Sequence, residues 1–320
     1  MRTIDWVDGA VELIDQTALP GEERVLRVTT VEDLIAAIRS LAVRGAPALG
    51  VAGAFGVALA ARQFAADAAS LTEAVRQLEG ARPTAVNLAR GAHRAAARLP
   101  KGFDAVLAEA CAVRDEEIAA STAMAARGAD LMVELCGARP RLLTHCNTGG
   151  LATVSGGTAL GVIIELHRRG ALASVIASET RPLLQGARLT AWELANGGVA
   201  FRVAVDSAGP FLMARGDVDA VIVGADRICA NGDVVNKIGT YAHALGAHRA
   251  GLPFVVVAPE STVDPDTPDG AAVWIEDRGA AEVTAFSDAV NPAFDITPHD
   301  LITAIVTDRR VIRMDHGEHP

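Results

Sequence analysis

The chain has 320 residues, half of them apolar and few of them aromatic, and a formal net charge of −10 at pH 7. A chain of this length can bury a large core, and the length fits two domains better than one. The negative charge argues against a nucleic-acid or acidic-membrane partner, because both would repel the chain, but it leaves room for a locally basic pocket that binds a small phosphate.

The cysteines and the N-terminal residues indicate the compartment. The four cysteines lie far apart without a CxxC pair, which argues against a disulfide framework or a zinc module and indicates a reducing compartment. The N-terminus has acidic residues where a signal peptide needs a basic and then an apolar stretch. The most apolar run, 46–61, is shorter than the roughly 20 residues of a membrane span, so we expect a buried helix and a cytoplasmic protein.

The first segment, residues 1–137, predicts a mainly helical domain that carries a small antiparallel sheet. Residues 3–29 alternate apolar and polar side chains around the Asp8-Gly9 turn, as a hairpin does. Thr30 is expected to cap the start of a helix over 31–43, and Gly45 its end. Further helices are expected at 46–61, 71–79, 85–98 and 103–127, the last with a short continuation to residue 136.

Two arginines of this domain lie beside predicted helix starts. Arg44-Gly45-Ala46 precedes Pro47, which opens the glycine-rich helix, and Arg82 precedes Pro83 and Thr84, where one helix ends and the next begins. A guanidinium group beside a helix N-terminus is well suited to hold a phosphate. The alternative for Arg44 is an exposed loop arginine.

The second segment, residues 138–320, alternates strands and helices. Strands are expected at 142–145, 174–177, 199–205, 220–223, 254–257 and, weakly, 273–276. Helices are expected at 158–169, 182–196, 210–215, 237–250 and 298–308. This alternation predicts right-handed βαβ units and a doubly wound parallel, Rossmann-like sheet, in which ligands bind beyond the carboxyl ends of the strands.

Polar side chains follow four of these strands at that edge, and their convergence predicts an active site for a small polar molecule. They are Cys146, Glu179, Asp206 and Asp226. Asp226 comes just after the unbroken apolar run 220–223, and Asn236 and Lys237 stand at the expected start of helix 237–250, where a cation and free backbone N–H groups would hold an anion. The alternative is that Asp226 caps a local turn and that Lys237 is solvated.

Two more positions at this edge are candidates. The loop 178–188 is dense in hydrogen-bonding groups, so Gln185 or Arg181 is expected to reach a ligand, unless Arg181 only pairs with Glu179. Cys146 lies where backbone dipoles favour a thiolate, although an inert buried cysteine is the alternative. His145 is adjacent, but side chains alternate along a strand, so the two should point apart.

Nucleotide and metal chemistry have little support in the sequence. It has neither a G-x-G-x-x-G nor a Walker motif. His243 and His248 are five residues apart, and no H-E-x-x-H motif is present. We therefore expect neither a dinucleotide or nucleoside-triphosphate site nor a metal site.

Nine stretches of the chain together resemble the methylthioribose-1-phosphate isomerase family of methionine salvage. They are RTIDWVDG, DQTALP, RGAPALG, RPTAVNL, LTHCNTGGLAT, ETRPLLQGARLTAWEL, VIVGADRICANGDVVNKIGTY, APESTVD and NPAFDITP, and they cover nearly the whole chain in order. The wider family includes ribose-1,5-bisphosphate isomerase and regulatory subunits of the guanine-nucleotide exchange factor of eukaryotic translation initiation. The resemblance implies an aldose-ketose isomerase of methylthioribose 1-phosphate, a homodimer, and no cofactor.

The resemblance also implies roles for individual residues. Asp226 becomes the proton donor and Cys146 the second catalytic group. The implied substrate contacts are Arg44, Gly45, Ala46, Arg82, Gln185, Asn236 and Lys237. Three places depart from the family pattern without touching the catalytic pair: Ser178 stands where aspartate is more usual, 207–210 replaces a Met-containing run, and Cys229 replaces an alanine.

The implied substrate has its anomeric oxygen locked in a phosphate ester, so an acid must protonate the ring oxygen before the ring opens. Asp226 needs a raised pKa, and hence a dry, apolar setting, for that role. The hydrogen on C2 then moves to C1, either as a proton through a phosphoenolate with Cys146 as base, or as a hydride in a site that Cys146 shapes. Both routes stay open. So do two rivals: an isomerase of ribose 1,5-bisphosphate or 5-deoxyribose 1-phosphate, and a non-catalytic regulatory subunit on the same fold.

Overall fold

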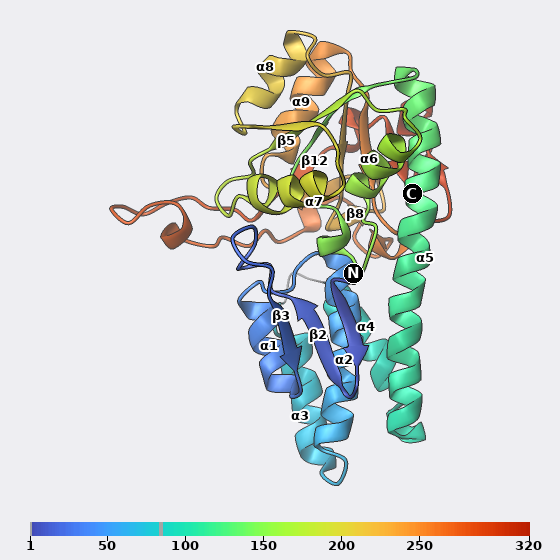
Figure 1. Cartoon of the computed structure of the whole chain (residues 1–320), viewed down its shortest axis with the longest axis vertical. Helices are drawn as coiled ribbons and strands as arrows, with labels where there is room; N and C mark the ends of the chain where they lie inside the picture. Colours follow the sequence, from blue (N-terminus) through green and yellow to red (C-terminus); the bar gives the residue numbers. More distant parts are fainter. Residues whose placement is uncertain (1, 83–85) are drawn as a thin grey trace. The chain divides into compact units, whose positions relative to one another are not determined.

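Figure 1 shows the computed structural model of the chain, which describes residues 2–82 and 86–320. Its internal contacts divide the chain into two compact units. The N-terminal unit runs to Ala120 and includes Gly150–Gly157, and the C-terminal unit comprises Ser121–Gly149 and Thr158–Pro320. This division falls inside a long helix, whereas the predicted boundary between 1–137 and 138–320 falls at the end of that helix. That the two predicted segments are separate domains stays a prediction.

The N-terminal unit begins with a three-stranded antiparallel sheet in the order β1-β2-β3. Its strands are Ile4–Val7, Ala10–Ile14 and Val25–Val28. The turn between β1 and β2 is Asp8-Gly9, with φ of 44° and 78°. Two successive residues with positive φ make the two-residue turn that Asp-Gly favours, so the predicted hairpin is confirmed.

Helix α1 (Val31–Arg39) starts where the sequence predicts. Thr30 Oγ1 accepts the N–H of Asp33 at 3.2 Å, which makes Thr30 the N-cap. The helix ends at Arg39, earlier than expected, and Ser40 is its C-cap. The prediction that Gly45 caps α1 is therefore wrong, because the turn between them closes on Ser40 and Gly45 instead starts the next helix.

Helix α2 (Ala46–Gln63) is the centre of the N-terminal core, and every residue from 46 to 61 is buried, as the uncharged run predicts. Helix α4 (Val86–Ala96) packs against it at backbone distance, since a Cβ on Gly91 would lie 1.9 Å from the carbonyl oxygen of Gly50. The other helices are α3 (Ala68–Glu79), η1 (Leu99–Lys101) and α5 (Phe103–Cys136), a single helix of 34 residues. The helix break predicted at Pro83 and Thr84 lies outside the described residues.

The C-terminal unit is built on a seven-stranded sheet of order β14-β13-β10-β7-β4-β5-β6. Its strands are β4 (Arg141–Thr144), β5 (Ser174–Ser178), β6 (Phe201–Ala204), β7 (Ala220–Val223), β10 (Phe254–Val257), β13 (Ala304–Val306) and β14 (Val311–Ile312). All neighbours are parallel except β14, which is antiparallel to β13. Counted along the chain, the six parallel strands have the order 3-2-1-4-5-6 of a Rossmann fold, and the predicted fold class is confirmed.

Helices cover this sheet on both faces (Figure 1). They are α6 (Ala159–Arg168), α7 (Ala191–Asn196), α8 (Ala208–Ala214) and α9 (Thr240–Ala250). The C-terminal unit also has a π-helix, η3 (Gly186–Thr190), and the 3₁₀ turns η4 (Glu260–Thr262), η5 (Gly270–Ala272), η6 (Ala280–Glu282), η7 (His299–Leu301) and η8 (Met314–His316). The 3₁₀ turn η2 (Gly150–Ala152) belongs to the N-terminal unit. Helix α6 packs on α5, where Gly128 faces Val162, and α8 packs on α9. In the part of the chain that the structure describes, no helix has both the length and the apolarity that crossing a membrane requires.

A second sheet of the C-terminal unit, which the sequence did not predict, has the order β11-β8-β9-β12. Its strands are β8 (Arg227–Cys229), β9 (Val234–Lys237), β11 (Val263–Asp264) and β12 (Phe294–Thr297). Residues 230–233 are the turn of a β8–β9 hairpin. Asn236 and Lys237 therefore end a strand instead of opening a helix, and α9 starts only at Thr240.

Two predictions near the C-terminus are wrong. Residues 273–276, predicted as a weak strand, are irregular. The predicted helix 298–308 is a 3₁₀ turn followed by β13, which lies between β10 and β14. A three-residue apolar run is too short to show a period, so only its partner strands distinguish it from part of a helix.

Candidate active site

The order of the parallel strands reverses between β4 and β7. At such a switch point the connections leave in opposite directions, and a crevice for a ligand opens beyond the strand ends. Cys146 follows the end of β4 and Asp226 follows the end of β7. The two loops lie against each other, since a Cβ on Gly224 would be 2.8 Å from Thr148 Cγ2. The structure thus brings together the two segments that carry the predicted catalytic residues.

The backbone of Cys146 is strained. Its φ is 61°, in the left-handed region that costs a non-glycine residue on the order of 1–3 kcal/mol and that is often found at functional sites. Its N–H donates to Thr180 Oγ1 at 2.9 Å, and its carbonyl accepts from Thr190 Oγ1 at 2.6 Å. Side chains from β5's following loop and from η3 therefore hold the main chain of this half-buried cysteine.

Asp206, which was predicted at the rim, anchors the loop after β5. Its Oδ1 accepts the Ser178 hydroxyl and the Thr180 N–H, the latter at 2.8 Å, and its Oδ2 accepts the Arg181 N–H at 2.7 Å. Burial raises the pKa of Asp206, but these hydrogen bonds outweigh burial, and the pKa is lowered overall. Asp206 is thus an anionic anchor for the loop whose Thr180 holds Cys146, and Ser178, a departure from the family pattern, is one of its partners.

Gln185 lies in the same loop and is buried, with 6 % of its surface exposed. Among the described residues its Oε1 has no hydrogen-bond partner. The chain is tightly folded here, since a Cβ on the next residue, Gly186, would lie 1.7 Å from the Ser178 carbonyl oxygen. A buried amide oxygen without a partner is costly, and a hydrogen-bond donor on a bound ligand would satisfy it.

Asn236 and Lys237 end β9 close to the start of α9. Asn236 is buried, and its Nδ2 donates to Thr240 Oγ1 at 3.0 Å. The Lys237 Nζ donates to the Ala293 carbonyl at 2.7 Å and lies 4.6 Å from the centre of the Phe294 ring. The ammonium group is therefore held by the segment that leads into β12.

Asp295, on β12 opposite Asn236, was missed by the sequence analysis. Helix α9 has Gly239 as its N-cap, which offers no side chain, and Asp295 Oδ2 accepts the N–H groups of Gly239 at 2.7 Å and of Tyr241 at 3.1 Å. Two of the backbone N–H groups at the start of this helix therefore already bond a carboxylate, and that Asn236 and Lys237 contact the substrate stays a prediction. Burial raises the pKa of Asp295 to about 6. The only signal in the sequence was its place in the family-like stretch NPAFDITP.

The two predicted arginines belong to the N-terminal unit. Arg44, with 8 % of its surface exposed, directly precedes Gly45, the N-cap of α2. Gly45 has φ of 94°, and a Cβ there would lie 2.3 Å from the Ala152 carbonyl oxygen, so only glycine fits. Ala46 is the first residue of α2, and Arg82 is half-buried after α3. That these residues contact a phosphate stays a prediction.

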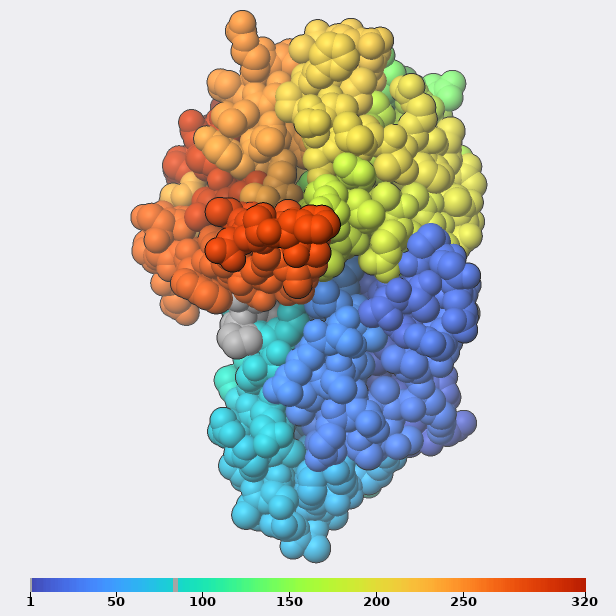
Figure 2. Space-filling view, turned by 90° about the vertical axis from the view of Figure 1, so that its left-hand side faces the viewer, coloured from blue at the N-terminus to red at the C-terminus, as the bar shows by residue number. Residues whose placement is uncertain are grey.

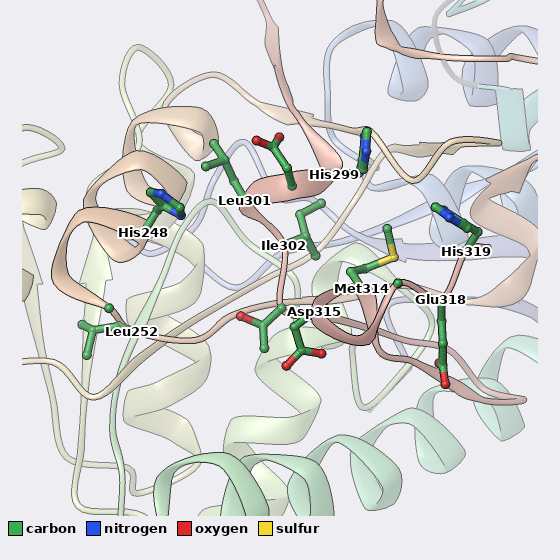
Figure 3. A pocket seen from close by; sticks show the side chains of 13 residues that line it. His248, Leu252, His299, Leu301, Ile302, Met314, Asp315, Glu318 and His319 are labelled. Atoms are coloured by element: carbon green, nitrogen blue, oxygen red, sulfur yellow. The ribbon is translucent and has the colours of Figure 1, made fainter.

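A cavity of about 490 Å³ lies elsewhere in the C-terminal unit (Figure 3). Its lining includes His248, His299, His319 and Met314. The lining segments lead into β10 and β13, which places the cavity at the amino ends of the strands, at the edge opposite to Cys146. It contains none of the predicted site residues, so the carboxyl edge of the sheet is the candidate active site. Within residues 2–82 and 86–320, no group of three or more His, Cys, Asp or Glu side chains could hold a metal ion.

Comparison of the sequence with models of known protein families shows which family the chain belongs to. The model of the initiation factor 2 subunit family matches residues 42–313. The chain belongs to this family. Matching residues span both units, and they include every candidate site residue named above.

Three curated proteins that are similar in sequence to this chain are named as isomerases. A probable bifunctional methylthioribose-1-phosphate isomerase/methylthioribulose-1-phosphate dehydratase of Nocardia farcinica is 53 % identical over 99 % of the chain, which spans 60 % of that protein. A methylthioribose-1-phosphate isomerase of Anaeromyxobacter sp. (strain K) is 52 % identical over 96 % of the chain and 92 % of its own length. A 5-deoxyribose 1-phosphate isomerase of Moorella thermoacetica is 47 % identical over 99 % of the chain and 95 % of its own length.

Two solved structures of the family are similar over nearly the whole chain. The 5-methylthioribose 1-phosphate isomerase of Pyrococcus horikoshii OT3 has a TM-score of 0.89 and 39 % identity, with 98 % of this chain and 92 % of that chain covered. The translation initiation factor eIF-2B subunit delta of A. fulgidus has a TM-score of 0.85 and 42 % identity, with 98 % and 96 % covered. The fold is thus shared between proteins named as isomerases and as initiation factors.

Proposed function

We propose that this member of the initiation factor 2 subunit family is an aldose-ketose isomerase that converts 5-methylthioribose 1-phosphate to 5-methylthioribulose 1-phosphate in methionine salvage. The observation that carries the proposal is the switch point of the parallel sheet, where a cysteine and an aspartate follow the neighbouring strands β4 and β7. The names of relatives that match this chain over nearly their whole length support it. The strained, doubly anchored backbone of Cys146 also supports it, because a strained residue is retained where its position matters.

In this proposal Asp226 is the general acid. Its carboxyl proton goes to the ring oxygen of the substrate while the bond from that oxygen to C1 breaks, and the proton that the C2 hydroxyl later releases returns to Asp226. A general acid of this kind contributes about 10²–10⁴-fold to the rate. The side chain of Asp226 is half-buried on the loop after β7.

Cys146 acts in the second step, in which the hydrogen on C2 moves to C1 and C2 becomes the ketone carbon. In the proton route the Cys146 thiolate removes the C2 proton and returns it to C1. In the hydride route the hydrogen moves with its electron pair, and Cys146 shapes the site. The cationic groups of Arg44, Arg82 and Lys237 hold the phosphate in either route.

The remaining predicted contacts complete the binding of the substrate. The buried Oε1 of Gln185 accepts a hydrogen bond from a sugar hydroxyl, which supplies the partner that it otherwise lacks. Gly45 and Ala46, at the start of α2, offer backbone N–H groups, and Asn236 orders the end of β9 beside Lys237.

The direct test is turnover by two variants and a control. We expect Asp226→Asn and Cys146→Ala each to lower kcat for methylthioribose 1-phosphate by at least about 10²-fold, with far-ultraviolet circular dichroism unchanged. Cys136→Ala is the matched control, because this cysteine ends α5 and burial raises the pKa of its thiol to about 11. Near-normal kcat of either catalytic variant refutes its assigned role.

Deuterated water separates the two routes for the hydrogen. The proton route exchanges with solvent and places deuterium at C1 of the ketose, whereas a hydride shift retains the substrate hydrogen. Mass spectrometry of the product distinguishes them, and a product with no deuterium rules out Cys146 as a base that exchanges with solvent.

Two rivals have a specific observation behind them. The Moorella thermoacetica relative favours 5-deoxyribose 1-phosphate as an alternative substrate, and ribose 1,5-bisphosphate is the third compound to compare. The substrate with the highest kcat/KM settles the choice. The family name and the A. fulgidus structure favour a regulatory subunit, and measurable turnover of any of the three compounds excludes a purely regulatory role.

We also propose that the protein is a cytoplasmic homodimer, and an exposed apolar arm supports the dimer. Residues 273–292 leave the body of the C-terminal unit as a long arm, seen at the left of Figure 1 and facing the viewer in Figure 2. Three of its apolar side chains are mostly exposed: Trp274 at 72 %, Phe286 at 98 % and Val290 at 87 %. Apolar surface of this kind marks interaction sites.

A further inference from the structure

Two histidines form a buried pair behind the candidate active site. His145, the last residue before Cys146, and His243, on α9, have 0 % and 1 % of their surfaces exposed. Their rings meet edge to face, with centroids 4.9 Å apart. Glycines make room for both rings: a Cβ on Gly239 would lie 2.9 Å from His145 Cε1, and a Cβ on Gly209 would lie 2.3 Å from His243 Nδ1. Substitution at either glycine would displace a ring, so the backbone is shaped around the pair.

The hydrogen bonds of the pair have one consistent direction. His145 Nε2 lies 2.8 Å from the carbonyl oxygen of Ile238, which can only accept, so Nε2 carries the proton and donates. The Nδ1 of a neutral His145 is then an acceptor, and His243 Nε2, at 3.3 Å, donates to it. His243 Nε2 is also 3.3 Å from the Ser178 hydroxyl. Burial lowers the pKa of His145 to about 4 and that of His243 to about 3, which agrees with two neutral rings at pH 7.

This chain of bonds joins two loops that are far apart in the sequence. The bonds run from His243 to His145, and from His145 to the carbonyl oxygen of Ile238. His145 is the residue before Cys146, and Ile238 is the residue after Lys237. Ile238 and Gly239 form the only connection between β9 and α9. The ring of the residue that precedes the candidate catalytic cysteine therefore holds the carbonyl group next to Lys237, in addition to the pairing of β9 with β12.

Burial is the main reason that the His145 ring stays neutral, because it lowers the pKa of His145 more than any other cause. The hydrogen bond to the Ile238 carbonyl and the carboxylate of Asp206, whose Oδ1 is 4.0 Å from His145 Nδ1, raise this pKa, while the charge of Lys237 lowers it. A protonated His145 would place a second cation beside Lys237 and would remove the acceptor that His243 needs. A neutral imidazole gives one donor and one acceptor on opposite sides of a rigid ring, which suits a link between two loops.

We propose that His145, supported by His243, is a positioning residue of the isomerase: its ring fixes the Ile238 carbonyl and thereby sets the place of Lys237 relative to Cys146. This inference rests on the proposed function for its meaning in catalysis. The mechanical link itself does not depend on the substrate, so it is open to a test without turnover.

The experiment compares three variants of the full chain. His145→Leu removes both bonds, His145→Gln keeps a donor near the position of Nε2 and an acceptor beside it, and Ile305→Ala on β13 is the control, because it opens the core of the same unit away from the pair. Two quantities are measured. The first is hydrogen–deuterium exchange of the peptide over 236–242, and the second is kcat and KM for methylthioribose 1-phosphate, at a temperature where all variants are folded by circular dichroism.

We expect His145→Leu to speed exchange over 236–242 by at least tenfold and to lower kcat/KM by at least tenfold with a clear rise in KM, because Lys237 loses its place. We expect His145→Gln to restore both to within about threefold of the unmodified protein. We expect Ile305→Ala to lower the melting temperature without a selective change in that peptide. Gly209→Ala, which displaces the His243 ring, should reproduce the His145→Leu pattern in part.

Each outcome decides the matter. Faster exchange over 236–242 in His145→Leu, with recovery in His145→Gln, supports the link between the two loops. If the unmodified protein turns over none of the sugar phosphates, the proposed function is wrong, but this exchange result still supports the link. Unchanged exchange in His145→Leu, or equal changes in Ile305→Ala, overturns the link. An active enzyme whose kcat/KM is unaffected by His145→Leu overturns the positioning role while leaving the proposed function intact.

Discussion

Asp295 offers a stability test whose sign follows from its surroundings. Its Oδ2 accepts two N–H groups at the start of α9, but Oδ1 is buried without a hydrogen-bond partner among the described residues, and burial raises the pKa from 3.8 to about 6. The folded state therefore binds the proton more tightly than the unfolded chain does. The free energy penalty of the ionised carboxylate is fully present above pH 6 and disappears as the pH falls through 6 towards 4.

The size of the penalty follows from the difference between the two pKa values. At about 1.4 kcal/mol for each tenfold change in proton affinity, a pKa of about 6 against 3.8 corresponds to roughly 3 kcal/mol, as an upper value. Asparagine keeps the carbonyl oxygen that accepts from Gly239 and Tyr241 and is a good N-cap, but it carries no charge. We therefore expect Asp295→Asn to be more stable than the unmodified protein by about 1–3 kcal/mol at pH 7.5, and by only about a third of that at pH 4.5, because the unfolded carboxylate is still mostly ionised there.

Urea unfolding at pH 4.5, 5.5, 6.5 and 7.5, followed by circular dichroism, measures the difference. Asp67→Asn is the matched control, because Asp67 also caps a helix but is exposed, and hydrogen bonds from Ser70 lower its pKa. Its charge stabilises the fold, so we expect no gain from its removal at pH 7.5. A loss of stability in Asp295→Asn that is the same at all four pH values refutes the reasoning.

Three further predictions follow from single contacts. Gly45→Ala should cost about 3 kcal/mol or more in urea unfolding, because its positive φ and the Ala152 carbonyl leave no room for a methyl group, and a cost below about 1 kcal/mol contradicts this. Asp206→Asn removes the anionic anchor of the loop that holds Cys146, so iodoacetamide should alkylate Cys146 at a rate changed at least threefold, and an unchanged rate would show that the anchor does not reach the thiol. Phe286→Ser on the exposed arm should weaken the proposed dimer in sedimentation equilibrium, and an unaltered dimer, or a monomeric unmodified protein, would remove the arm from the interface.

The parts of the fold that local chemistry decides were predictable. The Asp8-Gly9 turn, the Thr30 cap and the buried run 220–223 each depend on residues next to one another, through positive φ, a side-chain hydrogen bond and burial on both faces. The alternation of strands and helices after residue 138 was enough to predict a doubly wound sheet, because few other arrangements bury such elements.

The errors have a common physical cause. Asn236 and Lys237 end a strand because β12 pairs with β9, and Ala304–Val306 is a strand because β10 lies beside it. Both segments are too short to show a period, so their partners decide their structure. The occupation of the α9 N-terminus by Asp295 also depends on that pairing, which joins residues nearly sixty positions apart.

The sequence by itself determined the fold class, the family and the residue types at the ends of the parallel strands, because these follow from local patterns and from stretches that can be read in order. Only the tertiary structure decided that β4 and β7 are neighbours at the switch point, that threonines from other segments hold Cys146, and that a buried histidine joins its loop to that of Lys237. These contacts unite distant segments, and their hydrogen bonds depend on distances and directions that no local pattern of residues specifies.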